Sequence, residues 1–165
     1  MFPVRAGRAI LPPVKICHLY ISPGHNFWVR PKGSPGENPI VELTQVDCVA
    51  GRGLLGDRYF DHEKDYEGQA TFISADVFDE VCSTLGVSGR PPGITRRNVV
   101  VRGADLNSLV GKTFVVQGVE FEGVCECSPC SWMDHVIAPG AKAAMEGRGG
   151  LRVRILSDGR LRVDA

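Results

Sequence analysis

The sequence lacks the features that would place this chain on nucleic acid or in a membrane. Its 19 basic and 19 acidic residues cancel, so the total charge gives no reason to expect a polyanionic partner. No apolar run approaches the roughly 20 residues that a bilayer-spanning helix needs. Residues 1–16 also lack the uninterrupted apolar core of a secretory signal. We therefore expect a cytoplasmic protein that binds neither nucleic acid nor membrane.

Complete signatures for redox cofactors are missing as well. Six cysteines are present, but only three are grouped, so the four ligands of an iron–sulfur cluster are not at hand. We expect neither a nucleotide-binding fold nor pyridoxal phosphate binding. In a reducing compartment, cysteines serve as metal ligands, catalytic thiols or core residues more often than as disulfides. If this chain carries redox chemistry, its electrons are expected from a separate reductase.

Glycine and proline are frequent and divide the chain into short segments. The 20 glycines and 11 prolines are typical of a β-rich fold with many turns. We expect strands at 14–22, 40–49, 69–73 and 98–103, and hairpins at 113–126 and 151–163. In the second hairpin, Asp158-Gly159 suits a type I′ turn. Because about seven to nine strands must hide their edges, we expect one mainly β domain, residues 1–165, built as a closed or nearly closed β-barrel.

Two short helices complete the expected secondary structure. The first, at 74–86, begins at Ser74, whose hydroxyl can cap the first turn. Its apolar residues recur at helical spacing and place Cys82 on the buried face, which makes Cys82 a core residue. The second helix is expected at 138–147.

Two polar loops, at 23–39 and 51–68, are long for a compact domain, and loops of that length are usually functional or mobile. Phe27 and Trp28 in the first loop could stack on a flat ligand. Packing the loop against the domain is the more ordinary role for two such rings.

Three of the six cysteines lie within six positions in CECSPCSWM, residues 125–133. As a zinc site, Cys125, Cys127 and Cys130 would supply three soft ligands and His135 a fourth, but no second CxxC pairs with them. As a redox pair, Cys127 and Cys130 form a CxxC without the βαβ setting typical of such motifs. As a third alternative, one thiolate binds a metal or carries sulfur.

Cys130 is the strongest candidate for a functional thiolate. Pro129 fixes φ directly before it and removes a donor, so the approach of the chain is rigid. If the following residues turn helically, the end of that helix favours the thiolate, which suits a soft metal with open coordination positions. The plain alternative, in which all three cysteines fill core space, suits Cys125 better than Cys130.

Five segments together resemble the MOSC family, the domain named after the C-terminal part of molybdenum cofactor sulfurases, and in particular its stand-alone bacterial members. The segments are GLLGDRY (53–59), TFISADVFDEV (71–81), RRNVVVRGADLNSLVGKTF (96–114), CSPCSWM (127–133) and GRGGLRVRILSDGRLRVD (147–164). They follow the family's order over about residues 40–164. The resemblance implies a mainly β, barrel-like fold that binds molybdenum cofactor (molybdopterin), a pterin dithiolene with a phosphate.

The resemblance also implies roles for individual residues. It makes Cys130 the molybdenum ligand and the catalytic residue, with Cys127 beside it to tune or protect that thiol. The chemistry of the arginines agrees independently, because arginine forks match phosphate oxygens and can lie flat against a pterin ring. The candidate cofactor-binding residues are Arg58, Arg96, Arg97, Arg148, Asn98 and Asp57. Surface charge, for the arginines, and turn stabilisation, for Asn98 and Asp57, are the alternatives.

Relatives of this kind reduce N-hydroxylated bases, amidoximes and related N-oxygenated compounds, so a molybdenum-dependent oxidoreductase of that type is the leading hypothesis. One alternative is a non-enzymatic module that binds the cofactor or carries sulfur as a Cys130 persulfide for other molybdoenzymes. Another is a small thiol or zinc protein without pterin. Asp57, His62 and His135 are the candidate proton donors. Where the family often has histidine after GDR, this chain has Tyr59, so the role of that histidine is not transferred.

Overall fold

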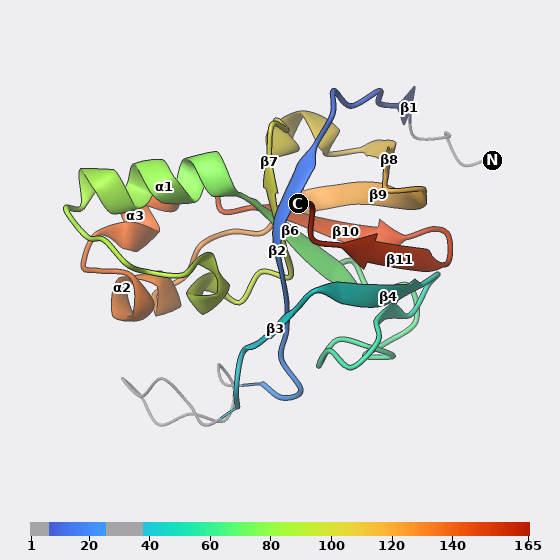
Figure 1. The fold of residues 1–165 in the computed structure, drawn as a ribbon, viewed down its shortest axis with the longest axis horizontal. Helices are drawn as coiled ribbons and strands as arrows, with labels where there is room; N and C mark the ends of the chain where they lie inside the picture. Colours follow the sequence, from blue (N-terminus) through green and yellow to red (C-terminus); the bar gives the residue numbers. More distant parts are fainter. Residues whose placement is uncertain (1–6, 26–37) are drawn as a thin grey trace.

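The structure is a computed structural model that describes residues 7–25 and 38–165 (Figure 1). Phe27 and Trp28, the possible stacking residues, lie outside the described residues. The strands are β1 (Gly7–Arg8), β2 (Lys15–Ile21), β3 (Val41–Leu43), β4 (Gln45–Val49), β5 (Gly53–Leu54), β6 (Ala70–Ser74), β7 (Val99–Arg102), β8 (Lys112–Val116), β9 (Val119–Glu126), β10 (Leu151–Ile155) and β11 (Gly159–Arg162). The α-helices are α1 (Ala75–Thr84), α2 (Trp132–Val136) and α3 (Ala141–Met145). The described part of the chain is therefore mainly β, as predicted.

Two sheets hold the strands. The larger has eight strands in the order β1-β8-β9-β10-β6-β7-β2-β3, and the smaller has three in the order β11-β4-β5. Most neighbours are antiparallel, but β1 with β8 and β6 with β7 are parallel pairs, and α1 lies in the connection between β6 and β7. No strand pairing among the described residues closes either sheet into a ring. The predicted barrel closure is therefore unconfirmed.

One apolar core lies between the two sheets. It joins Val46 and Leu161 of the small sheet to Phe72, Phe114 and Phe121 of the large one. The three phenylalanine rings meet with centroids 5.2 to 5.9 Å apart. Burying rings of this size stabilises the contact between the sheets by removing large apolar areas from water.

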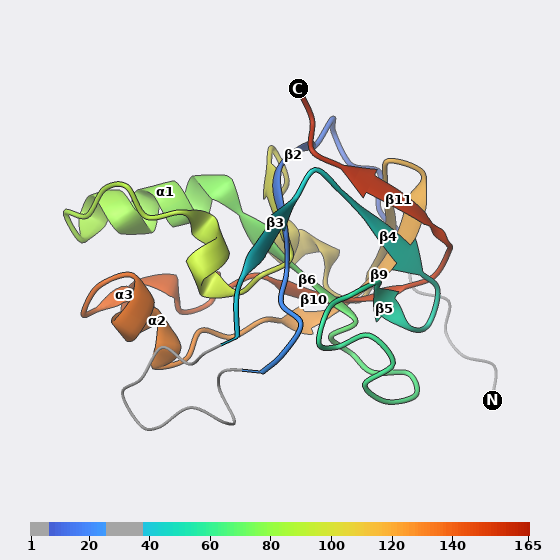
Figure 2. The ribbon, with the colours of Figure 1, turned by 60° about the horizontal axis from the view of Figure 1, so that its bottom comes forward.

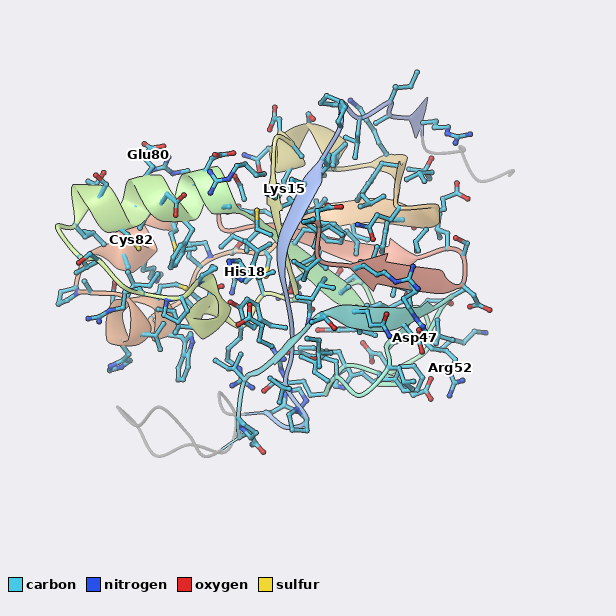
Figure 3. The ribbon with its side chains drawn as sticks, in the orientation of Figure 1. Lys15, His18, Asp47, Arg52, Glu80 and Cys82 are labelled. Atoms are coloured by element: carbon cyan, nitrogen blue, oxygen red, sulfur yellow. The ribbon has the colours of Figure 1, made fainter. Side chains whose placement is uncertain are left out.

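A second core lies at the helical end of the molecule, where Figures 1 and 2 show the three α-helices gathered on one side of the strands. Helix α1 begins as predicted, because the Ser74 hydroxyl accepts a hydrogen bond from the Val77 backbone N–H at 3.3 Å. The helix buries its own side chains Phe78, Val81 and Cys82 against the rest of the protein. Cys82 is therefore a core residue, as expected, and Figure 3 shows it on α1. Among the helices in the described ranges, none has both the length and the apolar character to cross a bilayer.

The predicted hairpin at 151–163 is wrong. Strand β10 pairs with β6 and β9, whereas β11 pairs with β4 in the other sheet. A type I′ turn needs positive φ at both central residues, and neither Asp158 nor Gly159 has one. The Asp158 carboxylate instead accepts a hydrogen bond from the Ala50 N–H at 2.8 Å. This contact lies beside the end of β4, the strand of the small sheet with which β11 pairs.

Two other segments differ from simple sequence interpretation. The stretch 40–49 is two strands, β3 and β4, which belong to different sheets. The segment GRGLLG, residues 51–56, has the G-x-G-x-x-G spacing, but it continues into turns instead of the helix that a dinucleotide fingerprint requires. The hairpin at 113–126 is confirmed, with positive φ at both Gln117 and Gly118.

Candidate functional site

A pocket of about 270 Å³ opens where the helical end meets the loop between β5 and β6. Its walls come from that loop, from the segment before β7, from the segment after β9, from α2 and from β10. The lining residues are His25, Arg58, Tyr59, Tyr66, Gly68, Thr71, Thr95, Arg96, Arg97, Cys127, Ser128, Cys130, Trp132, Met133 and Arg152. Four arginines and two cysteines thus share one cavity, which we call the main pocket.

Both thiols of the CxxC line the main pocket. Cys130 is half-buried, and Cys127 is buried with 7% of its surface exposed. Cys125, on β9, does not line it. Nor does the zinc alternative gain support, since within residues 7–25 and 38–165 no three His, Cys, Asp or Glu side chains come together as metal ligands. A metal in the main pocket would bind one or two of these thiols, and its remaining ligands would have to come from a bound cofactor or from solvent.

The thiols outside the main pocket sit in surroundings that disfavour the thiolate. Burial raises the pKa of Cys48 to about 12, with the nearby Asp47 charge acting in the same direction. Burial likewise raises the pKa of Cys82 and of Cys125. Since the thiolate is the nucleophile and the metal ligand, these three cysteines are suited to structural roles.

Arg97 fixes the cysteine segment in place. Its guanidinium donates to four backbone carbonyls, those of Gly149 at 3.0 Å, Thr95 at 3.1 Å, Cys127 at 2.8 Å and Ser128 at 3.4 Å. The residue is only 7% exposed. Arg97 thus borders the main pocket, but its guanidinium donates mainly to the backbone and not toward the cavity. Its role is to position the segment that carries Cys127.

Gly149 lets the chain pass against this same segment. A Cβ at Gly149 would lie 2.5 Å from the Cys127 carbonyl oxygen and 2.7 Å from Pro129 Cδ. We expect Gly149→Ala to lower the free energy of unfolding by about 2 kcal/mol, because a backbone atom cannot move aside cheaply. Gly7→Ala is the matched control, since Gly7 has no atom within 4 Å of such a Cβ. Urea unfolding of both variants measures the difference, and equal values would contradict the packing described here.

Arg96 and Arg58 present positive charge to the main pocket. Arg96 adopts the left-handed conformation at φ 62°, which is uncommon for a non-glycine residue. Its Nη2 donates to the Ser22 hydroxyl and the Gly24 carbonyl, but its Nη1 is buried without a hydrogen-bond partner. Burial, and then the charge of Arg58, lower the pKa of Arg96 to about 10, so it stays protonated at neutral pH. Arg96 therefore brings a half-buried positive charge with one unused donor to the wall of the main pocket, an environment that favours an anion.

Asp57 and Asn98 do not line the main pocket but build the frame behind it. The Asn98 side-chain oxygen Oδ1 accepts from the Thr71 N–H and hydroxyl, and the side-chain Nδ2 donates to the Tyr20 carbonyl and to Asp57. The Asp57 carboxylate also accepts from the Ser22 and Tyr59 backbone N–H groups. Both side chains are therefore occupied by protein groups. This differs from the expectation that they face a pterin edge.

Arg148 lies outside the main pocket. It borders a smaller cavity beside Ser74 and Gly150, and its guanidinium pairs with Glu80 at 3.0 Å. Figure 3 shows Glu80 on α1, at the helical end. Two of the suggested proton donors, His62 and His135, are exposed and, like Asp57, do not line the main pocket. The structure does not bring these residues to the two cysteines.

Several lining residues were missed or undervalued by sequence reasoning. Arg152 looks like one of the solvated arginines of an alternating strand, yet it borders the main pocket and pairs with Glu67 at 3.2 Å. His25 lies at the start of a long loop, and no motif marks it. Tyr66 lies in a polar loop where a single ring carries no periodic signal. Only their position in space shows that they share a site.

Comparison with known proteins agrees with the resemblance drawn from the motifs. The model of the MOSC domain matches residues 53–165, so the chain belongs to the MOSC domain family. The crystal structure of the YuaD protein from Bacillus subtilis is similar over 91% of both chains, with a TM-score of 0.67 and 19% identity. That of YiiM from Geobacillus stearothermophilus is similar over 91% of this chain and 71% of its own, with a TM-score of 0.64 and 15% identity. No curated protein matches the sequence.

Proposed function

We propose that this chain binds molybdenum cofactor in the main pocket and reduces N-hydroxylated bases or related N-oxygenated compounds. Membership of the MOSC domain family supports a relation to this cofactor. The observation that carries the proposal is that the half-buried Cys130 shares one cavity with Arg58, Arg96 and Arg152.

The number of metal ligands that the protein offers in the main pocket fits the cofactor. A metal in the main pocket finds no set of three protein ligands among the residues that the structure describes. A bound dithiolene would supply two sulfur ligands, and the Cys130 thiolate would then add a third to a set suited to a soft metal. Cys127, also in the main pocket, is close enough in sequence to tune that thiolate through the surrounding shell.

The residues present also fit the cofactor in charge. Arg96 carries a buried Nη1 without a partner, and a phosphate oxygen would satisfy it. The Arg58 guanidinium carbon lies 4.7 Å from the centroid of the Tyr59 ring, and Nη1 pairs with Asp57 at 3.4 Å, so both contacts hold the guanidinium at the wall of the pocket. An anion with a planar ring matches this combination of cations and flat surfaces.

The chain contributes binding and orientation to the reaction. When bound, the cofactor supplies the oxygen-atom transfer that breaks an N–O bond. The arginines hold the negative charge, and Arg97 keeps the cysteine segment in place through its hydrogen bonds to the Cys127 and Ser128 carbonyls. Reducing N–OH to N–H consumes two electrons and two protons and releases water. A separate reductase supplies those electrons, because the sequence has no complete iron–sulfur ligand set.

Metal and pterin analysis tests the proposal, on protein expressed in a host that makes the cofactor. We expect about one molybdenum and one pterin per chain, with turnover of an N-hydroxylated purine when a reductase is supplied. Arg96→Met should reduce the pterin content by about 10-fold, because a charge-assisted hydrogen bond contributes about 1.5–3 kcal/mol. Arg148→Met is the matched control outside the main pocket, and its pterin content should be unchanged.

The outcomes separate the alternatives. Protein that contains zinc, or neither metal nor pterin, would rule out the cofactor proposal. Protein that binds the cofactor without reducing any N-oxygenated compound would instead favour the carrier alternative, in which Cys130 bears a persulfide. Mass spectrometry of the purified chain detects that persulfide directly.

A further inference from the structure

Three groups that carry or can carry positive charge meet at one corner of the main pocket: Arg58, Arg96 and His25. The Tyr59 ring contacts two of them, because the Arg58 guanidinium carbon lies 4.7 Å from its centroid and the His25 ring meets it edge-on at 5.0 Å. Arg96 reaches the same place, since its Nη2 donates at 2.8 Å to the carbonyl of Gly24, the residue directly before His25. All three groups line the main pocket. We call Arg58, Arg96 and His25 the cationic corner.

His25 is the member of the cationic corner whose charge can change. Arginine keeps its charge throughout the physiological range, whereas histidine changes its charge between about pH 5 and 8. Of the residues that the structure describes around the main pocket, His25 is the only histidine, and the other groups that ionise are arginines, tyrosines and cysteines, whose ordinary pKa values lie higher. At neutral pH, the charge that the pocket offers to a ligand therefore depends on His25.

Without a ligand, the surroundings hold the half-buried His25 ring in its neutral form. Burial lowers the pKa of His25, and the charge of Arg58 lowers it further. His62 and Arg96 act in the same direction, whereas the carboxylate of Asp57 opposes them. These charged groups come from the β5–β6 loop and from the segment before β7. The ring is therefore neutral at pH 7, and the fixed charge of the two arginines exceeds that of the one carboxylate by a single positive charge.

An anion in the main pocket reverses this balance. Negative charge beside the ring favours the imidazolium form, so a ligand that neutralises the arginines also raises the pKa of His25. By linkage, the protonated ring holds the anion more tightly than the neutral ring does. Because protonation accompanies binding, the affinity for the anion increases as the pH falls through the pKa of His25 in the complex, and it levels off below the pKa of His25 in the free protein.

We propose that His25 in its protonated form is the third cation that binds a dianionic phosphate monoester in the main pocket, so that binding takes up a proton. The carboxylate of Asp57 pairs with Arg58 at 3.4 Å and cancels one arginine charge. The protonated ring raises the excess from one positive charge to two, which matches a dianion. This inference rests on the proposed function where the phosphate is that of the cofactor, and the same chemistry fits the phosphate of another ester.

Sulfate binding tests the inference on protein from a host that does not make the cofactor, because sulfate stays a dianion across this pH range. We expect sulfate to bind about 10-fold more tightly at about pH 5.5 than at about pH 7.5, since an opposite charge in contact shifts a protonation equilibrium by at least this factor. Calorimetry in two buffers of different ionisation enthalpy counts the protons taken up. His25→Gln should bind sulfate equally at both pH values.

Two other histidines provide matched controls. His62 is exposed, lies 6.0 Å from the His25 ring between centroids and does not line the main pocket, and His135 is exposed on α2. Both His62→Gln and His135→Gln should keep most of the pH dependence. Nuclear magnetic resonance of the imidazole signals in the unmodified protein gives the pKa of His25 directly, and sulfate should raise it.

Cofactor-loaded protein provides the second arm of the test. Pterin should be lost during dialysis faster at about pH 8 than at about pH 6, and His25→Gln should remove this difference. A His25 pKa that sulfate leaves unchanged, or an equal pH dependence of sulfate binding in His25→Gln, would overturn the inference. Pterin retention that does not vary with pH, beside sulfate binding that does, would assign the site to another phosphate ester. If the purified protein contains no pterin while sulfate binding depends on His25, the proposed function fails and the anion site remains.

Discussion

Replacing Cys130 with alanine is expected to lower turnover of an N-hydroxylated purine by at least about 100-fold and to remove most of the molybdenum. Loss of residues that merely orient metal ligands already costs about 10–100-fold in metal affinity or activity, and Cys130 is the proposed ligand itself. Since Arg58 and Arg96 remain, the variant should retain part of its pterin. Metal analysis, pterin analysis and turnover are measured on the same preparation.

Cys125→Ala provides the matched control for this prediction. Cys125 lies on β9 outside the main pocket, and burial raises the pKa of its thiol. We therefore expect its removal to leave molybdenum content and turnover within about two-fold of the unmodified protein, as for a residue that touches no ligand. An active Cys130→Ala variant, or an equal loss in both variants, would contradict the assignment of Cys130 as the metal ligand.

Replacing Asn98 with alanine is expected to lower the free energy of unfolding by about 3–5 kcal/mol. The side chain makes four hydrogen bonds, and its loss leaves the Thr71 N–H and the Tyr20 carbonyl without these partners in a buried region. Each buried polar group left unsatisfied costs about 1–3 kcal/mol. The loss should also loosen Asp57, to which the Asn98 amide donates at 3.3 Å.

Asn107→Ala is the matched control for the Asn98 variant. Asn107 is exposed, and its amide donates to the Gly147 carbonyl at 2.8 Å. A hydrogen bond of this kind contributes about 1 kcal/mol or less at the surface. Urea unfolding of the two variants gives both values, and a loss below about 1 kcal/mol for Asn98→Ala would show that the network behind the main pocket is not a structural support.

Local signals in the sequence predicted several elements correctly. Ser74 marks the start of α1, and the hairpin predicted at 113–126 forms with its turn at Gln117 and Gly118. Both signals work because the residues that make the structure are neighbours in the chain. The same reasoning failed at Asp158-Gly159, because β11 pairs with β4, which lies far away in the sequence. A local turn signal cannot compete with a pairing that depends on the whole sheet.

For the candidate site too, the sequence showed some features correctly and could not show others. The motifs pointed to Cys130, Arg58 and Arg96, which the structure places around one cavity. They could not show how each polar side chain is used. Asn98 has the donors and acceptor that suit a ligand, but protein groups occupy them, and this depends on Thr71 and Tyr20 in neighbouring strands. Residue type is visible in the sequence, whereas partners are a property of the fold.

The walls of the main pocket are drawn from almost the entire length of the polypeptide, from His25 to Arg152. A growing chain that ends before residue 149 lacks both Arg152 and the Gly149 carbonyl to which Arg97 donates. No such N-terminal fragment can therefore offer the complete cavity. Any ligand that needs the complete cavity can therefore bind only after synthesis has passed β10 and Arg97 has reached the Gly149 carbonyl.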